Sequence, residues 1–194
     1  MFTSNENIQS SSHNQFNVGT HQKNEVGYYA QPYSLDAQGF YFSSFEEYQE
    51  KVETLRDCFG NPVEEFEIQF VDGSAEDSAL FEAFNINQCN LEAFLEMIEE
   101  LNDHEKAQVF YLGSNHGISL EDAFRSHEDV CITEQDANEY GYELFFEIYG
   151  HDIPESLHSY IDTDAFTHDM ELNGELCSFD FGGLNYLCTN ANGF

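Results

Sequence analysis

The side chains of this sequence that could perform chemistry are its histidines, its cysteines and its many carboxylates. A zinc hydrolase of the H-E-x-x-H type needs a second histidine four residues after the first, because both then lie on one face of a helix. His104 and His127 are each followed by glutamate, but neither they nor His168 have a histidine at that spacing. We therefore interpret these histidines as surface residues rather than metal ligands.

Other common site patterns fail as well. Residues 72–77 read D-G-S-A-E-D, which puts the glycine second and lacks the alternating ligands of a calcium loop. The sequence has no glycine-rich phosphate loop ending in lysine. Carboxylate pairs at a glycosidase spacing arise by chance among 38 acidic residues, so they carry no weight. The sequence therefore predicts no metal, no cofactor and no enzymatic activity.

The cysteines argue in the same direction. They are five, an odd number, and they form no C-x-x-C pair, which suits neither a disulfide framework nor a structural zinc site. A nucleophilic cysteine needs electropositive surroundings, whereas the nearest charged residues along the chain here are acidic. We interpret all of them as reduced thiols in the core: Cys58, Cys89, Cys131, Cys177 and Cys188.

What the sequence has in abundance is negative charge. The 194 residues include 38 aspartates and glutamates but 5 lysines and arginines, a formal net charge of −33. The acids are interleaved with aromatic and aliphatic residues, so a folded body carries them rather than a solvated tail. Duplex DNA is also densely and regularly negative. Such a protein can imitate DNA; its charge disfavours nucleic acids and anionic membranes as partners and favours a protein groove that normally holds phosphate.

The apolar content allows a core, since 41% of the residues are hydrophobic and 15% are aromatic. The sequence has neither a secretory signal nor an apolar run long enough to span a bilayer. We therefore expect a soluble, intracellular protein. Residues 1–25 are rich in Ser, Asn and Gln without apolar periodicity, and we expect them to be a disordered polar extension.

Local patterns predict a small α+β unit in residues 26–73. Two short runs of β-formers indicate a hairpin. Ser44 followed three residues later by Glu47 is a capping-box signature, and it predicts the start of a helix over residues 45–58. Alternation of Phe and Ile with acidic residues in residues 63–71 then predicts a strand with one face in water.

Two further sub-domains are expected after this one. Apolar residues at three- and four-residue spacing in residues 74–117 predict a helical module, and acids fill the opposite helix faces. Like charges four residues apart cost a few tenths of a kcal/mol, so their retention suggests that the negative field itself is selected; solubility or a salt-rich cytoplasm would also produce it. Residues 118–194 mix helices with a hairpin at Gly182-Gly183. The expected architecture is an elongated α+β protein of three small sub-domains with a strongly acidic surface.

An ordered set of segments in residues 26–187 resembles the ArdA antirestriction proteins. The segments are VGYYA at 26–30, GFYF at 39–42, FEEY at 45–48, LEDAF at 120–124, HEDV at 127–130, IPESL at 153–157 and DMEL at 169–172. The resemblance implies a dimeric DNA mimic carried by mobile genetic elements or phages. It also implies that the partner is a type I restriction-modification enzyme. The protein would bind the methyltransferase and specificity core of that enzyme and block its access to DNA, and it would catalyse no reaction.

Residues for this role follow from the acidic faces of the expected elements. We predict that they act as a set, so that single charge reversals cost little and grouped reversals much. The predicted mimic surface consists of Glu46, Glu47, Glu50, Glu53, Glu92, Glu96, Glu99, Glu100, Glu121, Asp122, Glu128 and Asp129. The predicted dimer contact consists of Val130, Cys131 and Ile132, for which a strand in the core is the alternative.

Three other functions remain open at this point. The chain could be an acidic chaperone that sequesters basic DNA-binding proteins, an inhibitor of another DNA-scanning defence system, or an enzyme from a salt-adapted organism. The chaperone would bind basic proteins without competing with DNA for a defined groove. The salt-adapted enzyme would have uncharged residues around a functional cleft, and no such gap is obvious in the sequence.

Overall fold

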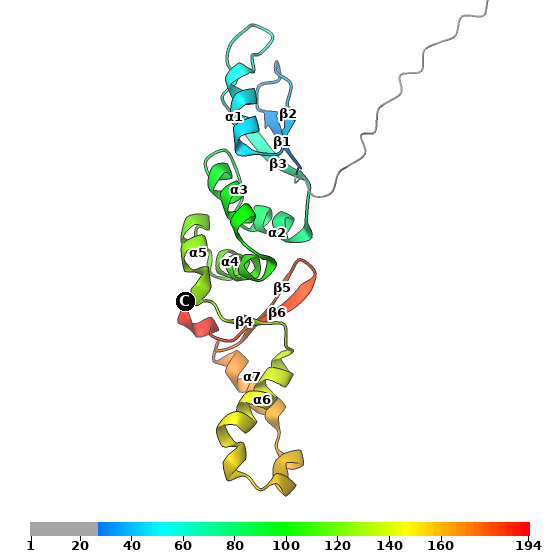
Figure 1. Cartoon of the computed structure of the whole chain (residues 1–194), viewed down its shortest axis with the longest axis vertical. Coiled ribbons are helices and arrows are strands. Elements are labelled where there is room, and N and C mark those ends of the chain that lie inside the picture. Colours follow the sequence, from blue (N-terminus) through cyan, green and yellow to red (C-terminus); the bar gives the residue numbers. More distant parts are fainter. Residues whose placement is uncertain (1–26) are drawn as a thin grey trace, which may run out of the picture.

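The computed structural model of the chain describes residues 27–194. The predicted extension at residues 1–25 and the first residue of the predicted first strand, Val26, lie outside the described residues. Figure 1 shows a long, narrow body with a sheet at one end, a helical hairpin at the other and the C-terminus beside its middle. Helices and two small antiparallel sheets confirm the α+β prediction.

The first sheet has the strand order β2-β1-β3, with β1 at Gly27–Pro32, β2 at Phe40–Phe42 and β3 at Phe66–Asp72. Tyr28 in β1 is fully buried among aromatic rings, with Phe42 stacked at 5.4 Å. The predicted alternation in β3 is confirmed, because Phe66 is buried while Glu67 next to it is exposed. The sheet therefore buries one face and leaves the other, which carries Glu67, in water.

Helix α1 (Phe45–Thr54) begins where the sequence predicts, but the predicted capping box is wrong in one half. Ser44 Oγ accepts from the backbone N–H of Glu47 at 3.2 Å, as expected. The Glu47 carboxylate does not return to Ser44; it accepts from the backbone N–H of Ser43 at 2.8 Å. The helix also ends earlier than predicted, because the Asp57 carboxylate accepts from two following backbone N–H groups and closes a turn.

The middle of the chain is helical, as predicted, with α2 at Ala75–Ala83, α3 at Leu91–Glu100, α4 at Asp103–His116 and α5 at Leu120–Ser126. Helix α4 is the most enclosed, and Val109 and Leu112 are fully buried. One apolar cluster runs without interruption from Tyr28 in the first sheet through these helices to Cys188 in the second. The division into three sub-domains stays a prediction.

The second sheet has the order β4-β6-β5, with β4 at Ile132–Thr133, β5 at Cys177–Phe181 and β6 at Leu184–Cys188. Gly182 and Gly183 both have positive φ, as a two-residue hairpin of type I′ requires. Strand β4 is short, and it follows a 3-10 turn, η1, formed by His127–Asp129.

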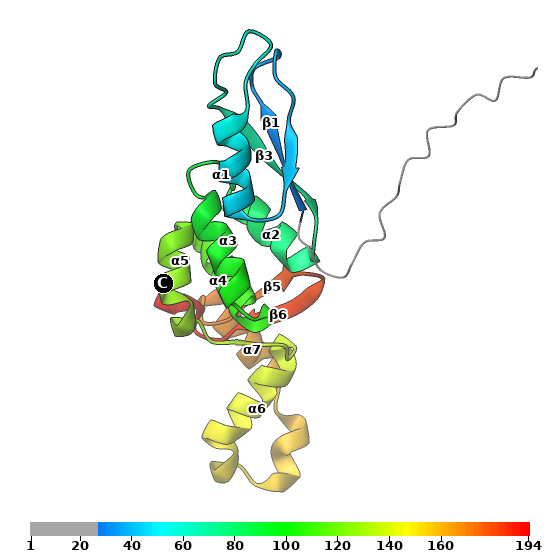
Figure 2. The same cartoon turned by 45° about the horizontal axis from the view of Figure 1, so that its top comes forward.

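Beyond this sheet, α6 (Ala137–Tyr149) and α7 (Thr163–Leu172) form the helical hairpin at the far end of the body (Figure 2). They are joined by the 3-10 turns η2 (Gly150–Asp152) and η3 (Glu155–Tyr160), and η4 (Ala191–Gly193) precedes the last residue. The two helices approach closely at Gly141, where a side chain would collide with Thr167. In the described part of the chain, every helix is too short or too polar to cross a membrane.

The cysteines are free, as predicted, but their predicted place in the core is wrong for most of them. Cys188 is buried, and burial raises the pKa of its thiol. Cys177 is half-buried, whereas Cys58, Cys89 and Cys131 are exposed. Cys58 and Cys89 lie in turns that follow helices, where little chain is left to cover them.

One buried ion pair joins two of the central helices. Lys106 Nζ in α4 lies 2.7 Å from Asp77 Oδ1 in α2, and their side chains are only 10% and 8% exposed. Asp77 is also held from the other side, since its backbone N–H donates to the capping Ser74 hydroxyl. A buried charge is tolerated only with a partner, so each of these residues depends on the other.

We predict that Lys106→Met lowers the free energy of unfolding by about 3–5 kcal/mol, because Asp77 then stays buried without its partner. Urea unfolding followed by circular dichroism measures the change. Arg125→Gln is the matched control: it removes the same charge from the exposed pair with Asp122 and should cost less than about 1 kcal/mol. Equal effects of the two variants would contradict a structural role for the buried pair.

Candidate partner-binding surface

The acids predicted for the mimic surface lie on three helices and one turn. All of them are exposed except Glu47, which is half-buried. They are distributed as Glu46, Glu47, Glu50 and Glu53 on α1; Glu92, Glu96, Glu99 and Glu100 on α3; Glu121 and Asp122 on α5; and Glu128 and Asp129 on η1.

These helices follow one another along the body. Helix α1 contacts α3, and α3 contacts α5. Figures 1 and 2 show the three in this order down the same side of the molecule. Acids that are far apart in the sequence therefore share one side of the body. We call this set of acids on α1, α3, α5 and η1 the acidic row.

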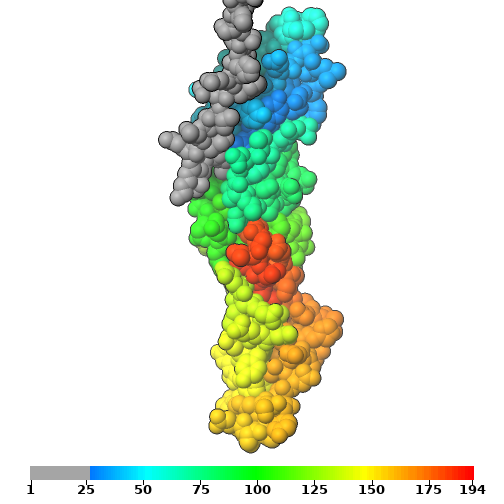
Figure 3. Space-filling model, turned by 90° about the vertical axis from the view of Figure 1, so that its right-hand side faces the viewer, coloured from blue at the N-terminus to red at the C-terminus, as the bar shows by residue number. Residues whose placement is uncertain are grey.

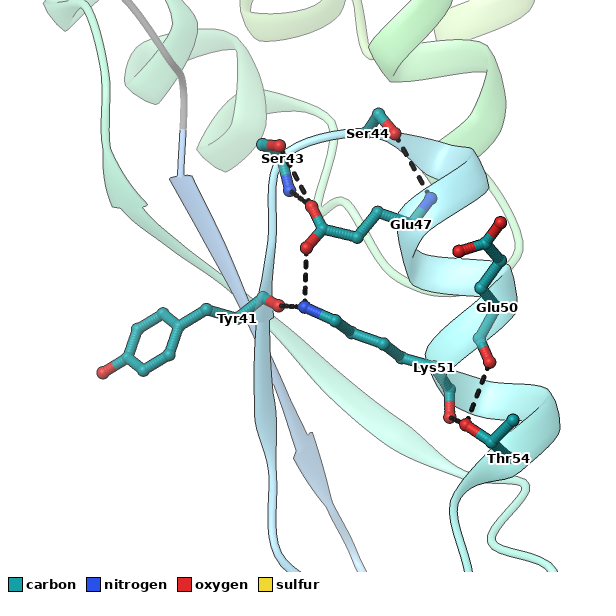
Figure 4. Close-up of polar contacts among 7 residues, drawn as sticks. All are labelled: Tyr41, Ser43, Ser44, Glu47, Glu50, Lys51 and Thr54. Atoms are coloured by element: carbon teal, nitrogen blue, oxygen red, sulfur yellow. Dashed lines mark hydrogen bonds and ion pairs between the residues drawn. The ribbon is translucent and has the colours of Figure 1, made fainter. Parts of the chain in front are cut away.

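At the α1 end of the acidic row, the carboxylate of Glu47 is already bound within the fold (Figure 4). Lys51 Nζ lies 2.6 Å from Glu47 Oε1 and donates as well to the backbone oxygen of Tyr41 at 2.6 Å. The hydrogen bond from Lys51, followed by that from the Ser43 backbone, lowers the pKa of Glu47. The Glu50 carboxylate contacts none of the other residues drawn in Figure 4, so it remains free for a partner.

Within residues 27–194, the lysine and arginine side chains are already engaged within the protein. Besides Lys51 and Lys106, Arg125 pairs with Asp122 at 2.9 Å, and Arg56 donates to the backbone oxygens that precede it. Among residues 27–194, no ion pair involves the acids of α3. In the described part of the chain, the acidic row therefore presents carboxylates whose charge is not neutralised by neighbouring side chains, except at Glu47 and Asp122.

Sequence reasoning passed over acids at the other end of the molecule. Glu139, Glu143 and Glu147 on α6 are exposed and recur every four residues, which places them on one helix face. The same periodicity that led to the α3 acids could have found them. The exposed carboxylates thus continue beyond the acidic row to the helical hairpin that ends the body in Figure 3.

The predicted dimer residues have unlike surroundings. Val130 is buried in the core of its own chain, where its backbone oxygen accepts from Gln108 Nε2 at 2.6 Å. Cys131 is exposed, and Ile132 is half-buried in β4, an edge strand of the second sheet. The prediction of a dimer contact therefore depends on Cys131 and Ile132 and on the unpaired edge of β4.

The prediction that the histidines lie on the surface is wrong for one of them. His104 and His168 are exposed, but His127 is buried, its ring stacked on Phe124 and its Nδ1 at 2.7 Å from the Phe124 backbone oxygen. Its place in a turn between α5 and β4 turns the ring inward. No group of three or more potential metal ligands occurs in the described part of the chain.

A shallow groove opens within the acidic row. It lies between α3 and α5 and has a volume of about 470 Å³. Its walls combine apolar side chains with charged ones, which are Ala93, Glu96, Leu120, Glu121, Phe124 and Arg125. The row is therefore not uniform, because at this point it offers a partner an apolar surface as well as carboxylates.

We predict that salt stabilises the fold, because screening relieves the repulsion among acids that lack basic partners. The midpoint of urea unfolding should rise between about 0.01 M and about 1 M NaCl, over which the screening length falls from about 30 to about 3 Å. The triple variant Glu139→Gln, Glu143→Gln, Glu147→Gln should show a weaker rise. A midpoint that does not depend on salt would contradict this account of the charge.

Comparison with known proteins connects this geometry to a family. No curated protein matches the chain. The family model described as Antirestriction protein (ArdA) matches residues 34–183, from the loop after β1 to the turn between β5 and β6. The matched region contains the whole acidic row, and the family consists of inhibitors that act on restriction-modification enzymes without catalysis. Because the match covers most of the chain, this protein belongs to the ArdA antirestriction protein family.

Proposed function

We propose that this protein inhibits type I restriction-modification enzymes by acting as an acidic mimic of duplex DNA. Its target would be the DNA-binding groove of the methyltransferase and specificity core. The observation that supports this most directly is the acidic row, in which exposed carboxylates on α1, α3, α5 and η1 follow one side of a long, narrow body. Family membership supports the antirestriction role independently.

The physical basis of inhibition would be replacement of phosphates by carboxylates. A DNA-binding groove is lined with lysine and arginine side chains, which the row would engage at several points at once. Opposite charge on the two surfaces would speed association, and salt would weaken it. The inhibitor needs no bond-forming step, since occupying the groove is sufficient to exclude DNA.

The proposal includes a homodimer in the host cytoplasm. Two acidic bodies repel one another, so a contact must be made where acids are few. The edge of β4 at Ile132, next to the exposed side chain of Cys131, would allow such a contact, because edge strands pair through their backbones. Residues 26–73, 74–117 and 118–194 remain our proposal for its three sub-domains.

The decisive experiment is a competition titration. Purified protein is added to a type I methyltransferase complex that holds labelled cognate duplex, at low and at high salt. We expect DNA to be displaced, and displacement to weaken as salt rises. Failure with several such enzymes would overturn the proposal. Binding to histone-like basic proteins in the same conditions would then favour a sequestering role, and displacement from another DNA-scanning complex would change the target.

We also predict that the acids of α3 act together. Each of the single variants Glu92→Gln, Glu99→Gln and Glu100→Gln should weaken inhibition by about twofold or less, since each removes one solvated charge among many. The triple variant should weaken it by about eightfold, about 1.2 kcal/mol, if each carboxylate contributes about 0.4 kcal/mol.

The matched control for this triple variant is Glu139→Gln, Glu143→Gln, Glu147→Gln on α6, which changes the net charge by the same amount. Equal losses in the two triple variants would mean that total charge rather than the acidic row governs inhibition. A single variant that abolishes inhibition while the fold survives would contradict collective action.

A further inference from the structure

The groove between α3 and α5 differs from the rest of the acidic row because half of the residues that line it are apolar. Ala93 and Phe124 are half-buried and Leu120 is buried, and together they line a hollow of about 470 Å³. Phe124 is held in place by its ring stacking on buried His127, at 6.1 Å between centroids and 6° between planes. The hollow therefore has a firm wall and room for a side chain.

The rim of this groove is negative and unpaired. Glu96 on α3 and Glu121 on α5 both line it, both are exposed, and within residues 27–194 neither carboxylate takes part in an ion pair or a side-chain hydrogen bond. Asp122 beside them is different, since it is engaged by Arg125 at 2.9 Å and by the Ser119 hydroxyl at 3.0 Å. The rim thus offers two free acceptors above an apolar floor.

Building on the proposed function, we propose that this groove takes up one arginine side chain of the enzyme to which the protein binds. The aliphatic stem of the arginine lies on Leu120, Ala93 and Phe124, and its guanidinium reaches the carboxylates of Glu96 and Glu121. An acidic or purely apolar side chain does not match the charged rim, and a nucleic acid is repelled by it.

Arginine fits better than lysine for two reasons. Its guanidinium is planar and weakly hydrated, so it can lie against the Phe124 ring at little cost in hydration. It also carries five N–H donors, which can serve two carboxylates from facing helices at once, whereas an ammonium acts as a point charge. The groove therefore adds to the DNA-like charge a contact that DNA phosphates do not provide.

Removal of Arg125 should strengthen binding of an arginine rather than weaken it. Arg125 also lines the groove, and its positive charge opposes an incoming cation. Arg125→Gln should tighten binding of an arginine by about twofold, because it removes this repulsion. Arg56→Gln is the control, because Arg56 lies outside the groove and contacts backbone oxygens. It should change arginine binding less than Arg125→Gln does.

The direct test is an NMR titration of the full chain with acetyl-Gly-Arg-Gly-amide as the probe. The peptides with citrulline and with lysine in place of arginine are the controls. We expect shift changes concentrated on the residues that line the groove and arginine binding about tenfold tighter than citrulline binding. Equal binding of arginine and citrulline, or arginine-induced changes spread evenly over all acidic helices, would overturn the inference.

A charge-neutral variant separates the groove from the general field. Ala93→Leu narrows the hollow without changing the net charge, and Ala165→Leu, at an exposed position on α7, is its control. We expect Ala93→Leu, but not Ala165→Leu, to weaken both peptide binding and displacement of DNA by about tenfold. This is the effect expected when one or two methylene groups of the arginine side chain can no longer be buried. Unchanged displacement by Ala93→Leu would overturn the inference and leave the proposed function intact.

A second pair of variants covers the case in which Ala93→Leu fails to fold. Glu96→Gln with Glu121→Gln should weaken arginine-peptide binding by about tenfold. Glu143→Gln with Glu147→Gln, which removes the same charge from α6, should change it little, and equal losses in both pairs would refute the groove. If the unmodified protein displaces no DNA, the proposed function fails and the peptide titration alone decides whether the groove binds arginine.

Discussion

Repulsion among carboxylates is the constraint on which the rest of this structure depends. With a net charge of −33, the chain has too few bases to join its segments by ion pairs. Its segments are joined instead by apolar contact, in a cluster that is rich in aromatic rings and continuous from the first sheet to the second. In the described part of the chain one acid, Asp77, is buried, and the basic side chain of Lys106 is buried with it.

The narrow shape also follows from this constraint. Exposed charges interact over roughly 10 Å at moderate salt, so drawing the chain out separates acids that a spherical body would bring together. A narrow body has less interior to bury, and large side chains offset this, since an aromatic ring removes about 150–250 Å² from water. Tyr28 shows the arrangement, with Phe42, Phe81 and Phe94 around its ring. The same shape leaves the acids in a row.

Local features of this fold could be read from the sequence, whereas features that join distant segments could not. Asp162 was predictable as a helix cap, because its carboxylate accepts a hydrogen bond from the backbone N–H of Ala165, only three residues further along the chain. The pairing of Asp77 with Lys106 bridges 29 residues and has no local signature. The Glu47 carboxylate departs from the capping box because Lys51 and Ser43, both outside that motif, hold its two oxygens. The acidic residues were evident by type, but their order along one side depends on how α1, α3 and α5 pack.

Charge and shape have different parts in recognition. A field of carboxylates acts at a distance and accelerates encounter, but it attracts every basic groove and weakens with salt. Discrimination among basic partners needs contacts that depend on shape, and these mainly slow dissociation. The groove between α3 and α5 is such a contact, because it places apolar Leu120 and Phe124 beneath the carboxylates of Glu96 and Glu121. Under the function that we propose, the protein competes with DNA for an enzyme, and it then gains more from this addition than from further charge, since DNA itself already supplies charge.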